Sequence, residues 1–149
     1  MGKLSGIYAR LTPYATLVLR LACGFVMFWH GKVKFFDTKI SGVKGFFTAI
    51  NVPIPGVSAP TVALLELVGG LLIIFGIGTR IVSTLFILEL IGALVYYKYA
   101  KHVGVIGKDQ AGSEIDWVLI AGFFALAAYG AGQFAVDHVL GIESRPATA

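Results

Sequence analysis

The chain has 149 residues, of which 57% are hydrophobic and 13% are charged, and its formal net charge is +4. These values are typical of a membrane protein and suit one domain of about four helices. The small positive charge is spread through the loops, which argues against nucleic acid as a partner. The single cysteine, Cys23, excludes an intramolecular disulfide and redox chemistry by a resident cysteine pair.

The N-terminal third predicts one membrane span followed by a helix in the membrane interface. Thr12 and Pro13 suit a helix start, because Thr can cap and Pro fits the first turn, so we expect the first span at about 13–31. Arg20 interrupts its apolar run, so we expect a retained helix and no cleaved signal sequence. Over about 34–51, apolar residues recur at steps of three and four, which indicates an amphipathic interfacial helix. They are Phe36, Ile40, Val43, Phe47 and Ile50.

The next two apolar stretches predict spans two and three. Residues 59–78 carry a single charge, at Glu66, and twenty residues at a rise of about 1.5 Å cross the roughly 30 Å hydrocarbon core of a bilayer. The third span is expected at about 80–99 and contains Glu89. The short connection from Gly76 to Arg80 makes these two spans antiparallel neighbours.

A fourth span is expected at about 114–134, opened by a capping-box pattern at residues 113–116. The predicted fold is therefore an all-α membrane protein, a four-transmembrane-helix bundle with an interfacial helix between spans one and two. An even number of spans puts both termini on one side. The excess of lysines in the two longer loops favours the cytoplasm for those loops and the outside for the termini.

Two charges inside the expected spans are predicted to pair with each other. Insertion scales put a charge at mid-membrane at about 3 kcal/mol, so such a group normally has a partner. Counted along the helices, Arg20 lies about 12 Å and Glu89 roughly 15 Å from the same side of the membrane. The similar depths predict a buried Arg20–Glu89 ion pair. Packing specificity without any substrate is the alternative role of such a pair.

Glu66 is predicted to lie near the end of span one, where His30 or Lys34 would be its partner. A histidine beside a membrane carboxylate can relay protons or hydrogen-bond a polar head group. The alternative is again a role in packing alone. Near the termini, Arg80 and Asp137 are expected to form an interfacial pair.

The residues reveal neither a metal site nor a catalytic motif. The three histidines, His30, His102 and His138, share no ligand spacing. There is no phosphate loop, nucleotide fingerprint or serine nucleophile elbow. Catalytic residues therefore stay unknown, and whether the chain is an enzyme is left open.

The ordered set of these residues resembles the DoxX family of small bacterial integral membrane proteins. The likeness runs from about Arg20 to Asp137, and Glu89 departs from the family pattern. It rests on Arg20-Leu21, His30-Gly31, Lys34, Phe47, Pro53 and Pro55, Leu65-Glu66-Leu67-Val68-Gly69-Gly70, Gly78-Thr79-Arg80, Gly130-Ala131-Gly132 and Asp137.

The resemblance implies a multi-pass protein of the bacterial inner membrane and a membrane subunit of an oxidoreductase complex that meets quinone. The chain itself would carry no cofactor, and His30, Lys34 and Glu66 would be the polar groups available to quinone. The expected partners are membrane lipids and either other protein subunits or further copies of the chain.

Two other functions remain open. A non-catalytic accessory subunit of a larger membrane assembly would use its charged interior for packing alone. A small proton-coupled transporter would use one membrane carboxylate to exchange protons for a substrate. Substitution of Glu66 by glutamine distinguishes the two, because only the transporter would lose proton-driven transport with its assembly intact.

Overall fold

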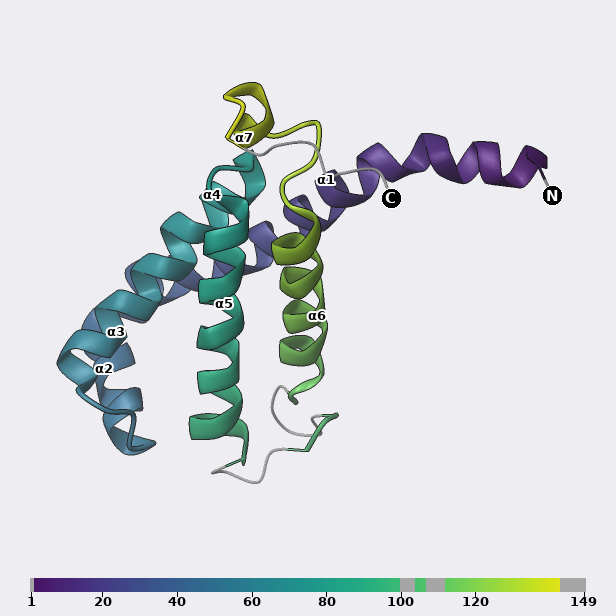
Figure 1. The fold of residues 1–149 in the computed structure, drawn as a ribbon. Coiled ribbons are helices and arrows are strands. Elements are labelled where there is room, and N and C mark those ends of the chain that lie inside the picture. The colour runs from purple at the N-terminus through teal and green to yellow at the C-terminus, as the bar shows by residue number, and fades with distance from the viewer. Residues whose placement is uncertain (1, 100–103, 107–111, 143–149) are drawn as a thin grey trace.

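The computed structural model describes residues 2–99, 104–106 and 112–142, and this part of the chain is helical without any β-strand (Figure 1). His102, which shares no ligand spacing with the other histidines, lies outside those ranges. The elements are α1 (Gly2–Lys32), the π-helical turn η1 (Val33–Asp37), α2 (Lys39–Ala49), α3 (Pro55–Leu64), the π-helical turn η2 (Leu65–Gly69), α4 (Gly70–Phe75), α5 (Thr79–Ala93), the π-helical turn η3 (Leu94–Tyr99), α6 (Glu114–Tyr129) and α7 (Val136–Val139).

Three continuous helical segments are long and apolar enough to cross a membrane. They are Pro13–Asp37, Pro55–Phe75 and Thr79–Tyr97, and they correspond to the first three predicted spans. The second span is built from α3, η2 and α4 without a break. It ends at Gly76, whose φ of 72° lies in the left-handed region that favours glycine.

The ends of several predicted segments differ from the structure. Helix α1 begins at Gly2 and runs through Pro13, because proline can be tolerated inside a membrane helix when other groups satisfy the freed carbonyl. Residues 34–37 belong to η1 and extend the first span, so the separate amphipathic helix is the shorter α2. Helix α6 ends at Tyr129, and the positive φ angles of Gly130 and Gly132 place 130–134 outside it.

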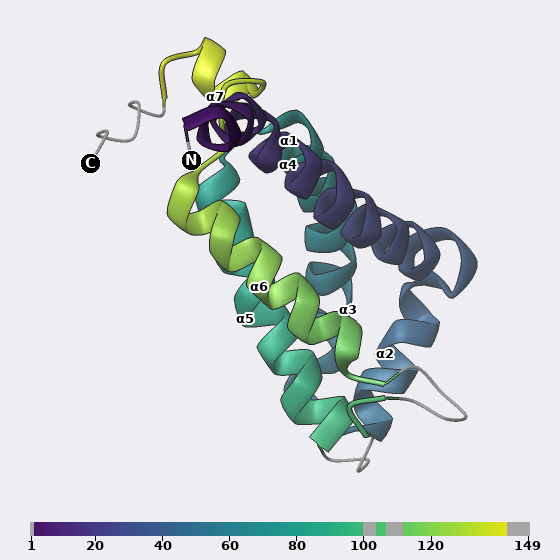
Figure 2. The same cartoon turned by 90° about the vertical axis from the view of Figure 1, so that its right-hand side faces the viewer.

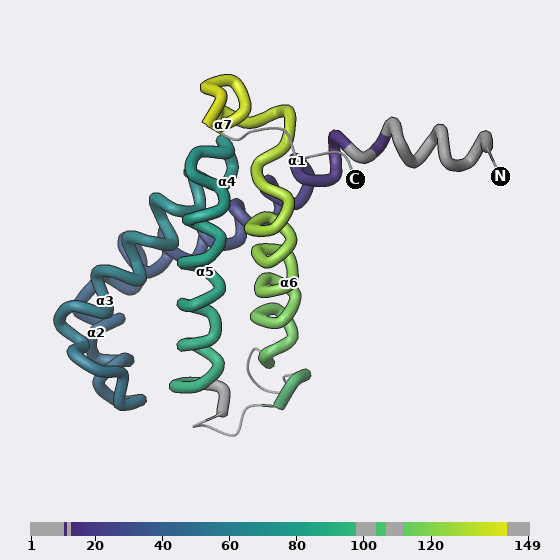
Figure 3. Tube along the Cα trace, in the orientation of Figure 1, coloured from purple at the N-terminus to yellow at the C-terminus, as the bar shows by residue number. Residues whose placement is uncertain are grey.

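Helix α1 crosses the molecule at a steep angle to α5 and α6, which lie side by side (Figures 1 and 2). The segments α3, η2 and α4 pack along α1, and α2 packs on α3. The trace in Figure 3 shows α7 at the end of the bundle where α4 ends. The predicted antiparallel arrangement of spans two and three follows from the short turn at 76–78.

The apolar core lies where these segments meet. Its centre is formed by Met27, Ile73, Phe86, Phe123 and Leu126, all with 0% exposure. The rings of Phe86 and Phe123 have centroids 4.8 Å apart, a favourable separation for an aromatic pair. Many other large apolar side chains are exposed along the helices, and hydrocarbon chains of a bilayer are the surroundings that suit them.

Glycines let the backbone of α1 come into direct contact with the backbone of the second span. A Cβ added to Gly70 would lie 2.7 Å from the Cα of Phe28 and 2.8 Å from the carbonyl oxygen of Gly24. A Cβ at Gly24 would in turn lie 2.9 Å from the carbonyl oxygen of Gly70. Small residues at such contacts are the usual means of close helix packing in membranes.

Candidate functional site

Lys34 and Glu66 form an ion pair where η1 meets η2, with the lysine Nζ donating to Oε1 of the carboxylate. The side chain of Lys34 is 28% exposed, whereas that of Glu66 is 3% exposed. The lysine side chain is therefore partly exposed while the carboxylate is buried. A carboxylate buried to this degree is tolerated when a cation bonds it directly.

Both partners of this ion pair lie in π-helical turns. Lys34 belongs to η1 and Glu66 to η2. Single π turns within α-helices are rare and occur frequently at functional sites. A wider turn also changes which side chains face a neighbouring helix, so the two turns determine which atoms meet here.

Glu89 on α5 joins this pair. It lies within electrostatic reach of Glu66 and Lys34, and of Asp116 at the start of α6. We call Lys34, Glu66 and Glu89 the charged triad; its members come from η1, η2 and α5.

His30 is not brought to the triad. Its side chain is exposed on α1, and no contact with Glu66 is found among the residues that the structure describes. In a regular α-helix, residues four apart share a face. The π turn that contains Lys34 begins between the two residues, so the sequence spacing does not carry over.

The predicted Arg20–Glu89 ion pair is not formed. Arg20 is fully buried and donates from Nη1 to the carbonyl of Ile74 at 3.2 Å and from Nη2 to the carbonyl of Phe134. Ile74 lies in the last turn of α4, whose carbonyls lack intrahelical donors. Counting depth along each helix missed this arrangement, because α1 is tilted and a long arginine side chain can reach along it.

Arg80 and Asp137 lie near the same end of the bundle but bond to backbone groups of different helices. Both carboxylate oxygens of Asp137 accept hydrogen bonds at the start of α5, from the N–H of Gly78 at 2.9 Å and of Thr79 at 3.0 Å. Arg80 donates to the carbonyls of Ala127 and Ala128 at the end of α6. Backbone groups at helix ends lack intrahelical partners and bind charged side chains, so Asp137 and Arg80 each bond to a helix terminus.

Replacing Asp137 by alanine is expected to lower the stability of the bundle by about 1–3 kcal/mol, since the part-buried N–H of Gly78 and the buried N–H of Thr79 lose their acceptor. The Asp137→Asn variant, which keeps a single acceptor oxygen, is expected to fall in between. Thermal unfolding of the detergent-purified protein measures both. The control is Asp37→Ala, which removes an ion pair to Lys32 on the surface and is expected to change little. Equal losses in the Asp137 and Asp37 variants would contradict the capping role.

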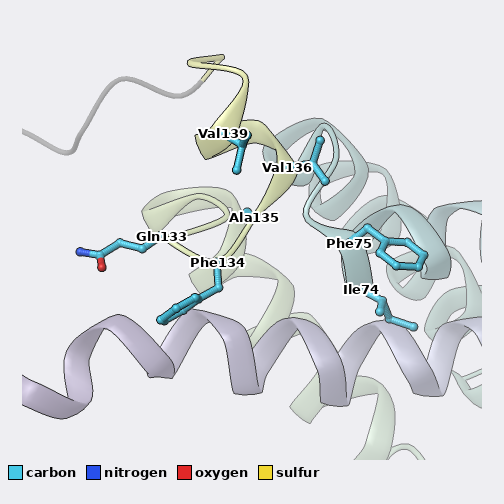
Figure 4. A pocket seen from close by; sticks show the side chains of 7 residues that line it. All are labelled: Ile74, Phe75, Gln133, Phe134, Ala135, Val136 and Val139. Atoms are coloured by element: carbon cyan, nitrogen blue, oxygen red, sulfur yellow. The ribbon is translucent and has the colours of Figure 1, made fainter.

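A pocket of about 490 Å³ opens at the α7 end of the molecule (Figure 4). Gln133 provides the one polar side chain of its lining, and in Figure 4 that side chain extends away from the apolar ones. The lining residues are Ile74, Phe75, Gln133, Phe134, Ala135, Val136 and Val139. The pocket has the size of a ligand site but lacks the convergent polar groups that such sites contain.

The fold and the charged triad together define a small helical membrane protein with ionisable groups buried between its spans. The chain belongs to the DoxX family, whose family model matches residues 15–98. This result confirms the resemblance seen in the sequence.

Two relatives support the assignment. The protein named "Putative oxidoreductase CatD" of Bacillus subtilis (strain 168) is 37% identical over 123 residues, covering 82% of this chain and 84% of that protein. The protein named "Uncharacterized membrane protein Rv3486" of Mycobacterium tuberculosis (strain ATCC 25618 / H37Rv) is 26% identical over 144 residues, covering 92% of this chain and 86% of that protein. No solved structure matches the chain.

Proposed function

We propose that this protein is a membrane subunit of an oxidoreductase complex and that it contacts quinone through the charged triad. The observation that carries the proposal is the Lys34–Glu66 ion pair, with Glu89 in electrostatic reach, within predominantly apolar spans. Ionisable groups inside a membrane are costly and generally mark a functional site. The name of the Bacillus subtilis relative, "Putative oxidoreductase CatD", supports the same class of reaction.

The charged triad has the polar groups that a protein site for quinone reduction requires. Conversion of a quinone to a quinol takes up two electrons and two protons. In this proposal a partner subunit supplies the electrons from its own redox centre. Lys34 is the cation of the triad and its side chain is 28% exposed, so its ammonium group would donate a hydrogen bond to a quinone carbonyl oxygen. His30 has no part in this version of the site, because it does not reach the triad.

The proposal places the protein in the bacterial inner membrane with α6 as a fourth span. Helix α6 has 16 residues, or about 24 Å at the α-helical rise, and runs antiparallel to α5 (Figure 1). Four spans put both termini on one side, which the lysine distribution favours as the outside. The assembly would contain lipids together with other protein subunits.

The test is purification of the native complex in a mild detergent, with measurement of co-purifying proteins and of bound quinone by mass spectrometry. For the wild type we expect a redox partner and about one quinone per complex. The Lys34→Met variant is expected to lose most of the quinone, because the ammonium donor is gone. The matched control is Lys32→Met, since Lys32 pairs on the surface with Asp37 and its loss should leave quinone unchanged.

A double variant, Lys34→Met with Glu66→Gln, separates loss of binding from loss of folding. It removes both charges of the buried ion pair, so neither partner is left as an uncompensated charge. We expect it to fold and still to lack quinone. Wild-type levels of quinone in the folded double variant, or a wild-type complex without any quinone, would overturn the proposed contact.

A further inference from the structure

Helix α2 has an outer face that the rest of the described chain leaves uncovered. Its apolar side turns inward and packs on α3, with Val43 only 3% exposed. Successive residues of an α-helix are about 100° apart, and the arc turned away from Val43 contains only small residues. All of them are exposed: Ser41, Gly42, Gly45, Thr48 and Ala49. This outer face is too polar for the hydrocarbon core of a bilayer and suits the level of the lipid head groups.

Two lysines flank this outer face. On the helical wheel, Lys39 lies at one side of the arc and Lys44 at the other, and both are exposed. Residues 32–49 contain four lysines and a single acid, Asp37. Lys32 and Lys34 are in ion pairs. Lys39 and Lys44 therefore remain as charges without an ion-pair partner in the part of the chain that the structure describes.

The backbone at Lys39 does not favour a lysine. Its φ of 62° lies in the left-handed region, where glycine and asparagine are the residues with the least strain. Strained residues of this kind occur frequently at binding sites. The conformation of the chain gives no reason for a long charged side chain at this corner, so its charge is the property that needs an explanation.

The outer face of α2 follows directly on the end of the first span. That span ends at Asp37, and Trp29 and Phe36 near its end are 51% and 63% exposed. The Nζ atom of Lys32 lies 5.5 Å from the ring centroid of Trp29. Exposed aromatic rings together with lysines are typical of the membrane–water interface. Figure 1 shows α2 beside α3, at the end of the molecule away from α7.

We propose that the outer face of α2 binds the head group of an anionic phospholipid, with Lys39 and Lys44 as the phosphate-binding cations. Lysine binds phosphate as a point charge. The small residues between the two lysines leave room for the head group, since a Cβ at Gly45 would meet nothing within 4 Å. The exposed rings of Trp29 and Phe36 favour a lipid over a soluble acidic protein, because they would lie beside its acyl chains.

Quenching of tryptophan fluorescence by brominated lipids tests this proposal. The chain has two tryptophans, so the full-length Trp117→Phe variant makes Trp29 the reporter. It is reconstituted in vesicles of phosphatidylcholine and phosphatidylglycerol, with one of the two lipids brominated. A lysine near an anionic lipid strengthens binding about fivefold, so we expect phosphatidylglycerol to be preferred beside Trp29 by at least that factor. The preference should weaken with added salt.

The variant Lys39→Asn with Lys44→Gln removes both cations and is expected to lose the preference. Asparagine suits the backbone conformation at residue 39, so the variant should fold, which its thermal unfolding midpoint checks. The control is Lys3→Gln, which removes a charge near the opposite end of α1 and should leave the preference unchanged. A preference for phosphatidylglycerol that survives in the folded double variant would overturn the proposal.

A second reporter separates a local site from general attraction to an anionic membrane. In Trp29→Phe, the remaining Trp117 is 48% exposed on α6, one residue after Asp116. We expect no preference for phosphatidylglycerol there. Equal preference at both tryptophans, or none at Trp29, would overturn the proposed site. The vesicles contain no quinone and no partner protein, so this proposal and the proposed function fail separately.

Discussion

Replacing Gly31 by alanine is expected to be among the most damaging single changes in this protein. An added Cβ would lie 2.6 Å from the Cα of Leu67 and 2.7 Å from the carbonyl carbon of Glu66, and closer still to the backbone nitrogen of Leu67. These are backbone atoms, which cannot rotate away as a side chain can, so α1 and η2 must separate. Overpacking typically costs 1–3 kcal/mol and occasionally more. We expect a loss of about 3 kcal/mol and a fall of roughly 5–10 °C in the unfolding midpoint.

The matched control is Gly92→Ala, because Gly92 also lies in a membrane span and a Cβ there would meet nothing within 4 Å. It is expected to be neutral or slightly stabilising, since alanine is the better helix former. Both variants are measured by thermal unfolding in the same detergent. If Gly31→Ala unfolded at the temperature of Gly92→Ala, the close contact between α1 and η2 would not exist.

The same substitution should disturb the charged triad. Gly31 lies against the backbone of Glu66 and Leu67, and Lys34 follows it in η1, which continues the same membrane span. Separation of α1 from η2 would therefore lengthen the Lys34–Glu66 ion pair. The contact between α1 and η2 therefore supports the fold and also holds Lys34 and Glu66 together in the candidate site.

The parts of the fold that follow from length and apolarity could be predicted from sequence. Three segments that are long and apolar enough to cross a membrane correspond to three predicted spans. The thickness of a bilayer directly sets the length of the apolar helix that crosses it. The ends were less predictable. Thr12 and Pro13 suit a helix start, yet α1 begins ten residues earlier at Gly2, since a favourable cap does not prevent a helix from continuing through it.

The candidate site could be predicted only in part. The sequence predicts Lys34 beside Glu66 because both are expected near the same side of the membrane. Glu89 is predicted as a membrane charge, but its position near Lys34 and Glu66 is not, because helix tilt and the reach of an arginine side chain are not visible in a one-dimensional count. The π turns at Lys34 and Glu66 have no signal in the sequence that would have distinguished them from regular helix.

Replacing Arg20 by alanine is expected to cost more than any surface change, and more than loss of the Asp137 cap. Arg20 is fully buried and joins three segments: α1, the carbonyl of Ile74 on α4, and the carbonyl of Phe134 in the loop before α7. Hydrogen bonds to charged groups contribute about 1.5–3 kcal/mol each, and the truncation also leaves a cavity. We expect a loss of about 4 kcal/mol and poor recovery of folded protein after detergent extraction.

The Arg20→Lys variant tests whether the guanidinium fork matters beyond its charge. A lysine places its donors on one nitrogen, so it is not positioned to bond both carbonyls as the planar fork does. Its stability, measured by thermal unfolding, is expected to lie between wild type and Arg20→Ala.

A Cβ at Gly76 would collide with the guanidinium group of Arg20, so Gly76→Ala is expected to destabilise the wild type more than it destabilises Arg20→Ala. Additive losses in that double variant would show that Arg20 does not fill the space beside the turn, and would contradict the bridging role argued for it.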